Sequence, residues 1–316
     1  MSTLAAAADD YLRVRRALGY KLDRQGRHLL QFIAYLDRAG ATTVTIEHAI
    51  GWATLPADAT AGYWCDRLSV VRQFARHLQT IDPACEVPPK GLLPYRRERP
   101  IPFLFTPADI ERMMRAARAL RGELHAATTQ TLIGLMAVTG IRVGEAIGLC
   151  RDDVDRPGQL IRVLDAKFAK SREVAVHETT IAALDGYAEL RDRVCPRPQC
   201  DAFFLSRNAT RLLYQCVRRV FMRLVAACGL EDRCPGSRPR PHSLRHSFAV
   251  NTLRDWYADG VDVQARLPLL TTHMGHVTPA STYYYLTAAP DLLALVARRL
   301  EATAERSPDG QPGTDA

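Results

Sequence analysis

The chain has 316 residues, a length that suggests two domains or one large one. Its composition, 47% hydrophobic and 24% charged residues, is ordinary for a globular protein, and it has no apolar run of about 18 residues, the length that spans a membrane. The N-terminus has no basic segment and turns acidic at Asp9, so we expect no signal peptide. These features argue against export, membrane insertion and wholesale disorder.

The charge of the chain is basic, with 42 Lys and Arg against 34 Asp and Glu. The excess is concentrated between Arg207 and Arg254, where ten arginines stand against two acids, Glu231 and Asp232. Arginine suits bidentate recognition of phosphate, because its planar guanidinium offers several donors. A polyanionic partner fits this pattern, although many basic proteins bind no nucleic acid.

Residues 1–82 are predicted to form a small helical domain. Two stretches carry apolar side chains at the i, i+3, i+4, i+7 spacing of one helix face. These faces comprise Leu29, Phe32, Ile33 and Leu36 in the first stretch and Leu68, Val71, Ala75 and Leu78 in the second. We expect Arg67, Arg72 and Arg76 on the opposite side of the second helix, which would give the domain a basic face.

A proline-rich linker is predicted over residues 83–105. Seven prolines fall within residues 83–107, a density that no helix sustains. Arg96, Arg97 and Arg99 make the segment basic, which suits a strap across a phosphate backbone and equally suits a solvated tether.

A second domain is predicted over residues 106–303, followed by a disordered tail at residues 304–316. Thr106 and Pro107 form a helix N-cap followed by proline at the first helical position. Helical patterns continue to about Cys150 and resume from about Thr179. Between them, Leu160–Leu164 and Arg172–Val176 alternate apolar and polar residues, which predicts a hairpin. The predicted fold is therefore mainly α with a small β-hairpin or sheet.

The segment Pro241-His242-Ser-Leu-Arg245-His246 places three cationic or donor side chains at i, i+3 and i+4 of a helix that begins at the proline. Two imidazoles and one guanidinium suit an anion such as phosphate. A polar helix face without a ligand is an alternative. A zinc pair is another, although the arginine would repel a dication and the glutamate of a His-Glu-x-x-His motif is absent.

Two shorter segments are weaker signals when each is taken alone. Arg142 stands at the first turn of a predicted helix, where the macrodipole disfavours a cation, so it serves either a ligand or an i, i+3 ion pair with Glu145. Lys167 and Lys170 lie at the predicted hairpin tip, where a lysine is usually solvated. Nearby cations could instead lower the pKa of such a lysine and make it a proton donor.

The last segment has Gly275-His276 followed by the run Tyr283-Tyr284-Tyr285. A tyrosine hydroxyl is a poor nucleophile at its usual pKa near 10 and becomes a useful one when cations or a base assist its deprotonation. The alternative interpretation is an aromatic core or interface.

The eight cysteines are expected to be reduced thiols. Four of them offer a possible zinc site, but the intervals between them are loose for a zinc ribbon. They are Cys195, Cys200, Cys228 and Cys234.

Taken together, in order and spacing, the four segments resemble the catalytic domain of tyrosine recombinases, the phage integrase family. The resemblance covers about residues 105–300, and residues 1–82 resemble the helical core-binding (SAM-like) domain of that family. It implies that Arg142 and Arg245 bind the scissile phosphate and that Tyr285 attacks it. It also implies the roles of three further residues: Lys167 protonates the leaving 5′-oxygen, His242 aids proton transfer and His276 hydrogen-bonds the phosphate.

The same resemblance implies that the chain binds double-stranded DNA, needs no cofactor or metal, and acts as a tetramer on two duplexes, alone or with a related recombinase. We expect further DNA contacts from Lys170, Arg172, His246 and the linker residues Arg96, Arg97 and Arg99. A helix over 289–303 is the candidate for packing into a neighbouring protomer. The expected location is the cytoplasm at the nucleoid, and the expected role is in a mobile element or in replicon resolution.

Two departures from the family pattern bear on local geometry: Phe168 replaces a glycine, and His273-Met274 replaces the common Leu-Leu or Tyr-Leu. Two alternative functions stay open at this point. A type IB topoisomerase shares the nucleophile and the cationic pocket, and a catalytically silent DNA-binding accessory protein would share the basic charge. The complete set of catalytic residue types argues against the second.

Overall fold

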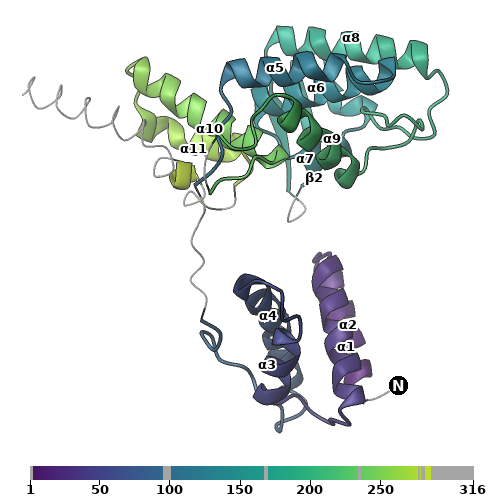
Figure 1. The fold of residues 1–316 in the computed structure, drawn as a ribbon, viewed down its shortest axis with the longest axis vertical. Helices are drawn as coiled ribbons and strands as arrows, with labels where there is room; N and C mark the ends of the chain where they lie inside the picture. Colours follow the sequence, from purple (N-terminus) through teal and green to yellow (C-terminus); the bar gives the residue numbers. More distant parts are fainter. Residues whose placement is uncertain are drawn as a thin grey trace, which may run out of the picture. The chain divides into compact units, whose positions relative to one another are not determined.

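The computed structural model describes residues 3–94, 101–166, 170–233, 236–276, 278 and 282–285, with the backbone alone at 165, 166 and 170. The chain divides into two compact units, Met1–Arg99 and Pro100–Ala316 (Figure 1). Each unit has a hydrophobic core of its own, so each is described separately below.

The N-terminal unit is a bundle of four helices (Figure 1). They are α1 (Thr3–Ala17), α2 (Asp23–Arg38), α3 (Ile46–Thr54) and α4 (Ala61–Leu78). Both apolar faces predicted from spacing are buried in its core, on α2 and α4 respectively. The helical prediction for this part of the chain is confirmed.

Two of the three arginines expected on an open face of α4 differ from the prediction, whereas Arg76 is exposed as expected. Arg67 is buried rather than exposed, because its guanidinium lies 3.6 Å from the centroid of the Trp52 ring and donates to the Trp52 carbonyl at 2.6 Å. Arg72 donates to the carbonyls of Pro88 and Pro89 at 2.7 and 3.0 Å. These two side chains therefore hold the unit together and do not belong to an open basic face.

The segment predicted as a linker, 83–105, is ordered at both ends. Cys85, Val87 and Leu92 pack against the core of the first unit. Phe103 and Phe105 are buried in the core of the second, where their ring centroids lie 4.8 Å apart. Only the middle of the predicted linker, including Arg96, Arg97 and Arg99, lies outside the described residues.

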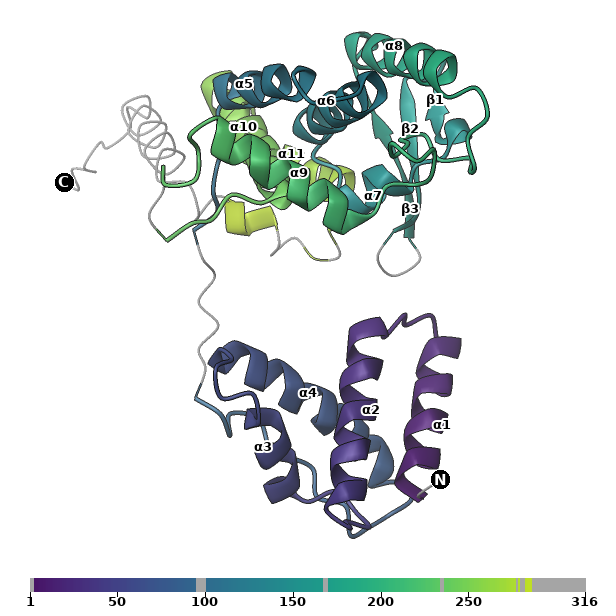
Figure 2. The same ribbon diagram turned by 45° about the vertical axis from the view of Figure 1, so that its right-hand side comes forward.

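The second unit is mainly helical with one small sheet (Figure 2). Its helices are α5 (Pro107–Arg118), α6 (Glu123–Thr139), α7 (Val143–Gly148), the 3-10 turn η1 (Arg151–Asp153), α8 (Glu178–Val194), α9 (Tyr214–Ala227), α10 (Pro241–Ala258) and α11 (Val263–His273). Its strands are β1 (Val154–Asp155), β2 (Leu160–Ala166) and β3 (Lys170–Ala175). The predicted fold class is confirmed.

Local sequence explains where two of these elements begin. Thr106 caps α5 by accepting from the Asp109 N–H at 3.2 Å, while the Asp109 carboxylate accepts from the Thr106 N–H at 2.8 Å, a reciprocal capping box. Pro241 occupies the first turn of α10, as predicted.

The sheet is antiparallel in the order β1-β2-β3. Its β2–β3 hairpin confirms the prediction, with Ile161 opposite Val174 and Val163 opposite Arg172. The strands extend further toward the tip than predicted, and the sequence analysis missed β1, which has only two residues. The side chains of Lys167 and Lys170 lie outside the description.

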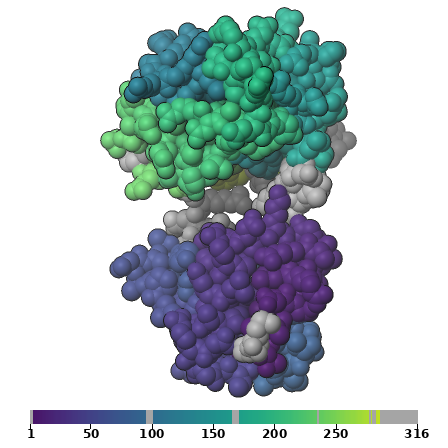
Figure 3. Space-filling model, turned by 90° about the vertical axis from the view of Figure 1, so that its right-hand side faces the viewer, coloured from purple at the N-terminus to yellow at the C-terminus, as the bar shows by residue number. Residues whose placement is uncertain are grey.

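The second unit contains a separate small core beneath α10 and α11. It includes Leu253 and Leu270 from these helices and also Tyr285. Figure 3 shows one face of the second unit in space-filling form, coloured from teal to yellow-green along the chain. The expected C-terminal helix, 289–303, and the tail, 304–316, lie outside the described residues.

Candidate functional site

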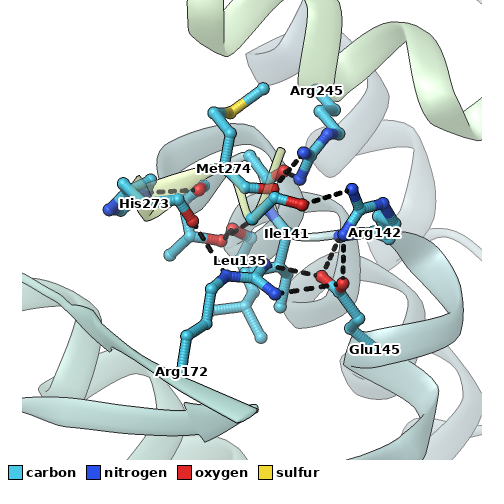
Figure 4. Close-up of polar contacts among 11 residues, drawn as sticks. Leu135, Ile141, Arg142, Glu145, Arg172, Arg245, His273 and Met274 are labelled. Atoms are coloured by element: carbon cyan, nitrogen blue, oxygen red, sulfur yellow. Dashed lines mark hydrogen bonds and ion pairs between the residues drawn. The ribbon is translucent and has the colours of Figure 1, made fainter. Parts of the chain in front are cut away.

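The first component of the site is the turn between α6 and α7. Gly140 ends α6 with φ +62° and a carbonyl that faces Arg245, and Arg142 is the N-cap of α7. Arg142 donates to Glu145 Oε1 at 2.6 Å and to the Gly275 carbonyl at 3.0 Å (Figure 4). Its guanidinium thus joins the start of α7 to the loop that follows α11.

Glu145 lies between two arginines (Figure 4). Besides Arg142, it accepts two hydrogen bonds from Arg172 of β3, at 3.1 and 2.8 Å, and its side chain is 7% exposed. Burial favours the neutral carboxyl and would raise its pKa. The bonds from Arg172 and Arg142 outweigh that cost and lower the pKa of Glu145 to about 2. Glu145 is therefore a buried carboxylate that positions two guanidiniums.

Arg245 of α10 is 2% exposed and bonds to backbone carbonyls. It donates to the Gly140 carbonyl at 2.7 Å and to the Met274 carbonyl (Figure 4). Burial, together with the charge of Arg142, lowers the pKa of Arg245 to about 10, so it stays cationic at neutral pH. Within the described ranges it forms no ion pair. Its charge is therefore offset by carbonyl dipoles and not by a paired carboxylate.

Arg172 and His273 tie the end of α11 to its neighbours. Arg172 Nε donates to the His273 carbonyl at 2.9 Å, and His273 Nε2 lies 2.8 Å from the Thr139 carbonyl. Because a carbonyl only accepts, Nε2 carries a hydrogen. The His273 ring also stacks on Phe248, at 5.2 Å between centroids and 22° between planes. His273, one of the departures from the family pattern, thus links the end of α11 to the end of α6.

Tyr285 is 2% exposed and lies beside His276. Its ring stacks on His276 at 6.0 Å and 23°. Burial raises the pKa of Tyr285, whereas interaction with Arg245 and the charge of Arg142 oppose that rise. The phenol is therefore neutral at rest and already faces the cations that would stabilise its anion.

Two further histidines, His242 and His246, lie next to each other, and one of them contacts Tyr285. His242 and His246 meet edge to face at 4.7 Å between ring centroids, and His246 lies 5.5 Å from the Tyr285 ring. His242 keeps part of its surface in solvent, yet the crowding of the site and the charges of Arg245 and Arg142 lower its pKa to about 4. Burial likewise lowers the pKa of His246 to about 3 and that of His276 to about 4. All three are neutral at pH 7.

The structure brings together most of the residues that the sequence analysis selected for catalysis. They are Arg142, His242, Arg245, His276 and Tyr285, with His246 beside them. Lys167 lies outside the described residues. Arg172 differs from its expected role, because its guanidinium is engaged by Glu145 and the His273 carbonyl rather than exposed to a ligand.

Sequence reasoning gave too little weight to Glu145 and His273. The Arg142-x-x-Glu145 spacing is the spacing of a capping box and could have signalled the reciprocal bonds seen here. No local pattern predicts that Arg172, 27 positions further on, shares the same carboxylate. The contact of His273 with Thr139 is equally nonlocal.

Two features of the described residues bear on the zinc alternative and on membrane insertion. No group of three or more His, Cys, Asp or Glu in this part of the chain is arranged to hold a metal ion; Cys234 lies outside it. Among the helices described, none is long and apolar enough to cross a membrane.

The chain is similar to known proteins over almost its whole length. The Phage integrase family model matches residues 104–291. The integrase/recombinase y4rB of Sinorhizobium fredii is 38% identical over 95% of this chain and 98% of that protein. The tyrosine recombinase XerD of Caulobacter vibrioides is 29% identical over 93% of this chain and 95% of that protein.

Solved structures support the fold. The Tn1549 transposon integrase, in complex with transposon right end DNA, superposes with a TM-score of 0.67 at 18% identity, over 95% of this chain and 100% of that one.

Proposed function

The chain belongs to the phage integrase family of site-specific tyrosine recombinases, and from that premise we propose how its own residues act. Arg142 and Arg245 bind the nonbridging oxygens of one DNA phosphodiester. The Tyr285 oxygen attacks the phosphorus, which forms a 3′-phosphotyrosyl bond and breaks the bond to the 5′-oxygen. A 5′-hydroxyl from a partner strand then reverses the step and releases the tyrosine.

The arginine pair supports the binding step. Arg142, Arg172 and Arg245 gather around one carboxylate, Glu145, so the site has an excess of positive charge. The transition state concentrates negative charge on the nonbridging oxygens, and donors fixed in advance are the main source of its stabilisation. Guanidiniums held by carbonyls and by Glu145 meet that requirement. We propose that they supply the charge that metal ions supply in other phosphoryl-transfer enzymes.

The environment of Tyr285 supports its role as nucleophile. Burial keeps the phenol neutral at rest, and Arg245 beside it stabilises the phenolate as the proton leaves. His242 and His246 are neutral, so each has an unprotonated ring nitrogen that can accept a hydrogen bond. The leaving 5′-oxygen needs a proton as well, and Lys167 remains the predicted donor.

One observation carries the proposal: Arg142 and Arg245 bond to consecutive carbonyls, Gly275 and Met274, and the Tyr285 ring stacks on His276, the next residue along the chain. Three segments that are distant in sequence therefore converge on the same few atoms. A protein that only binds DNA has no need of a buried tyrosine at such a point.

We further propose that double-stranded DNA contacts Lys170, Arg96, Arg97 and Arg99, as their charge predicts. Arg172 instead acts as a positioning residue through Glu145. His246 packs against His242 and Tyr285. This position favours a role at the phosphate that is cleaved over a contact with other phosphates of the DNA backbone.

The assembly and the biological role are proposals of the same kind. We propose a tetramer on two duplexes, in which the segment 289–303 of one protomer packs on its neighbour. The likeness to a transposon integrase supports a role in a mobile element. An enzyme that acts on chromosomal DNA would work in the cytoplasm at the nucleoid.

The test is covalent trapping on a nicked suicide substrate, from which the cleaved end diffuses away. Wild type should form a protein–DNA adduct that resists denaturant, and Tyr285→Phe should form none while still binding the duplex. Tyr283→Phe is the matched control, because Tyr283 is exposed and lies two positions before Tyr285. An undiminished adduct with Tyr285→Phe would place the nucleophile elsewhere. Relaxation of plasmids without strand exchange would favour a topoisomerase.

A further inference from the structure

Three consecutive backbone carbonyls at the end of α11 each accept a hydrogen bond from one arginine of the site (Figure 4). They belong to residues 273–275, which we call the carbonyl segment. In chain order these carbonyls accept from Arg172, Arg245 and Arg142. The position of the carbonyl segment therefore decides where the three guanidinium charges lie.

Backbone bonds fix the shape of the carbonyl segment but tie it only to α11 itself. The Met274 N–H donates to the Leu270 carbonyl at 2.9 Å, and the Gly275 N–H donates to the Thr272 carbonyl at 2.8 Å. The Met274 side chain packs in the small core beneath α10 and α11, and such apolar contact has no preferred direction. A directional contact between the segment and the turn after α6 must come from another side chain.

The imidazole of His273 makes that directional contact. Its Nε2 donates to the Thr139 carbonyl at 2.8 Å. Thr139 comes directly before Gly140, and His273 comes directly before Met274. The Gly140 and Met274 carbonyls are the two acceptors of Arg245. The bond from His273 to Thr139 thus runs beside the guanidinium and sets the separation of the two carbonyls that it spans.

We propose that the His273 imidazole is a positioning residue for DNA cleavage, which holds the carbonyl segment at a fixed distance from Gly140 and so orients the Arg245 guanidinium toward the scissile phosphate. This inference rests on the proposed function for the identity of the anion, but the hydrogen bonds do not depend on it. The family pattern commonly has leucine or tyrosine at this position. The imidazole N–H is therefore a feature of this chain.

The charge and packing of His273 suit this role. Burial, together with the charges of Arg172 and Arg245, lowers the pKa of His273, although the bond to Thr139 opposes the change. The neutral ring donates a hydrogen bond without adding a further positive charge to the site. It also stacks on Phe248, whose own ring lies against the Gly140 turn, so it has little freedom to rotate.

The first test is single-turnover cleavage of the suicide substrate. His273→Leu removes the donor and should slow cleavage by about 10-fold, because a misplacement of about 1 Å in an active site can cost up to about 10²-fold. His273→Gln keeps an N–H donor and should remain within about 3-fold of wild type. DNA affinity should change little in either variant. Thr272→Leu, at the exposed preceding position, is the matched control and should cleave like wild type.

A double-mutant cycle separates positioning from a general effect on the fold. In an Arg245→Ala background, His273→Leu should have little further effect on the cleavage rate, because the guanidinium that it positions is gone. The same loss of about 10-fold in both backgrounds would mean that His273 only stabilises the fold, and would overturn the proposal.

The last test needs no DNA, so it is independent of the proposed function. Nitrogen-15 NMR of the arginine side chains in the full-length protein reports how fast each guanidinium rotates, and Arg245→Ala assigns the signals. We expect slow rotation of Arg245 in wild type and in His273→Gln, because two carbonyls hold it, and faster rotation in His273→Leu. Unchanged rotation in His273→Leu would overturn the proposal. A wild-type protein that shows the slow rotation but cleaves no DNA would instead count against the proposed function.

Discussion

The N-terminal unit and the site of the second unit bury arginines in different ways. In the first, Arg67 rests on the Trp52 ring and bonds to the Trp52 carbonyl, so one neighbour accommodates the charge. In the second, Arg245 and Arg142 bond to the Met274 and Gly275 carbonyls, and the one carboxylate there, Glu145, pairs with Arg142 and Arg172, so positive charge remains in excess. A buried arginine alone thus serves packing, whereas convergent arginines with too few acids form an anion site.

The largest effect should follow from Arg245→Ala. Loss of one donor aimed at transition-state charge typically costs about 10²–10³ in rate, or about 3–4 kcal/mol. Single-turnover cleavage should fall on that scale, while duplex binding measured by fluorescence anisotropy should stay close to wild type. Cleavage within a few-fold of wild type would mean that Arg245, like Arg67, serves packing and not the reaction.

Glu145→Gln should change how stability depends on pH. The folded state lowers the pKa of Glu145 from 4.5 to about 2, which corresponds to about 3 kcal/mol of stability at neutral pH. Because the folded pKa is the lower one, this stability is present above pH 4.5 and is lost as the pH falls toward 2. The variant should therefore be less stable at pH 7 and match wild type near pH 2.

Chemical unfolding of both proteins across this pH range measures the difference. Glu173→Gln is the control, because Glu173 follows Arg172 on β3 but is 62% exposed and 3.9 Å from Arg162. Its ion pair should contribute no more than about 1 kcal/mol. Parallel stability curves for wild type and Glu145→Gln would refute a buried ionised carboxylate.

Gly140→Ala should destabilise the turn that holds Arg142 and Arg245. At φ +62°, an added Cβ would lie 2.4 Å from Phe248 Cδ1, and the two effects together should cost about 2 kcal/mol or more. Gly144→Ala, in α7, is the matched control. An added Cβ there meets nothing within 4 Å, so it should be neutral or stabilising in denaturant unfolding. Equal stability of the two variants would contradict the tight packing of the turn.

Arg67→Ala should have the smallest effect on chemistry. Loss of its stacking on Trp52 and of the bond to the carbonyl should destabilise the N-terminal unit by about 1–3 kcal/mol, seen as a lower melting temperature. Single-turnover cleavage at saturating enzyme should remain within a few-fold of wild type. A loss as large as that of Arg245→Ala would show that the two buried arginines serve the same purpose.

The same comparison explains what could be predicted from the sequence. The α2 and α4 faces follow from spacing, because burial against one core repeats every few residues. The site residues are predicted in another way. His242 and Arg245 form a short motif, but only the resemblance to tyrosine recombinases links that motif to Arg142 and Tyr285. The spacing of residues along the sequence does not show that segments more than 100 residues apart meet at one point in the fold.

The parts that were not predicted have nonlocal causes. Arg67 sits where an exposed arginine was expected, because Trp52 of another helix offers a ring and a carbonyl. Arg172 was expected to face DNA, but the buried carboxylate of Glu145 holds it. Both outcomes depend on a partner from another element, which no local pattern reveals.

The central claim is that the Tyr285 oxygen forms the covalent bond to DNA. Mass spectrometry of the trapped wild-type adduct, after digestion with protease and nuclease, tests it most directly. The account predicts a nucleotide attached through its 3′-phosphate to the peptide that contains Tyr285, with fragment ions that assign the phosphate to that side chain. Attachment to Tyr283, Tyr284 or a serine, or linkage through a 5′-phosphate, would contradict it.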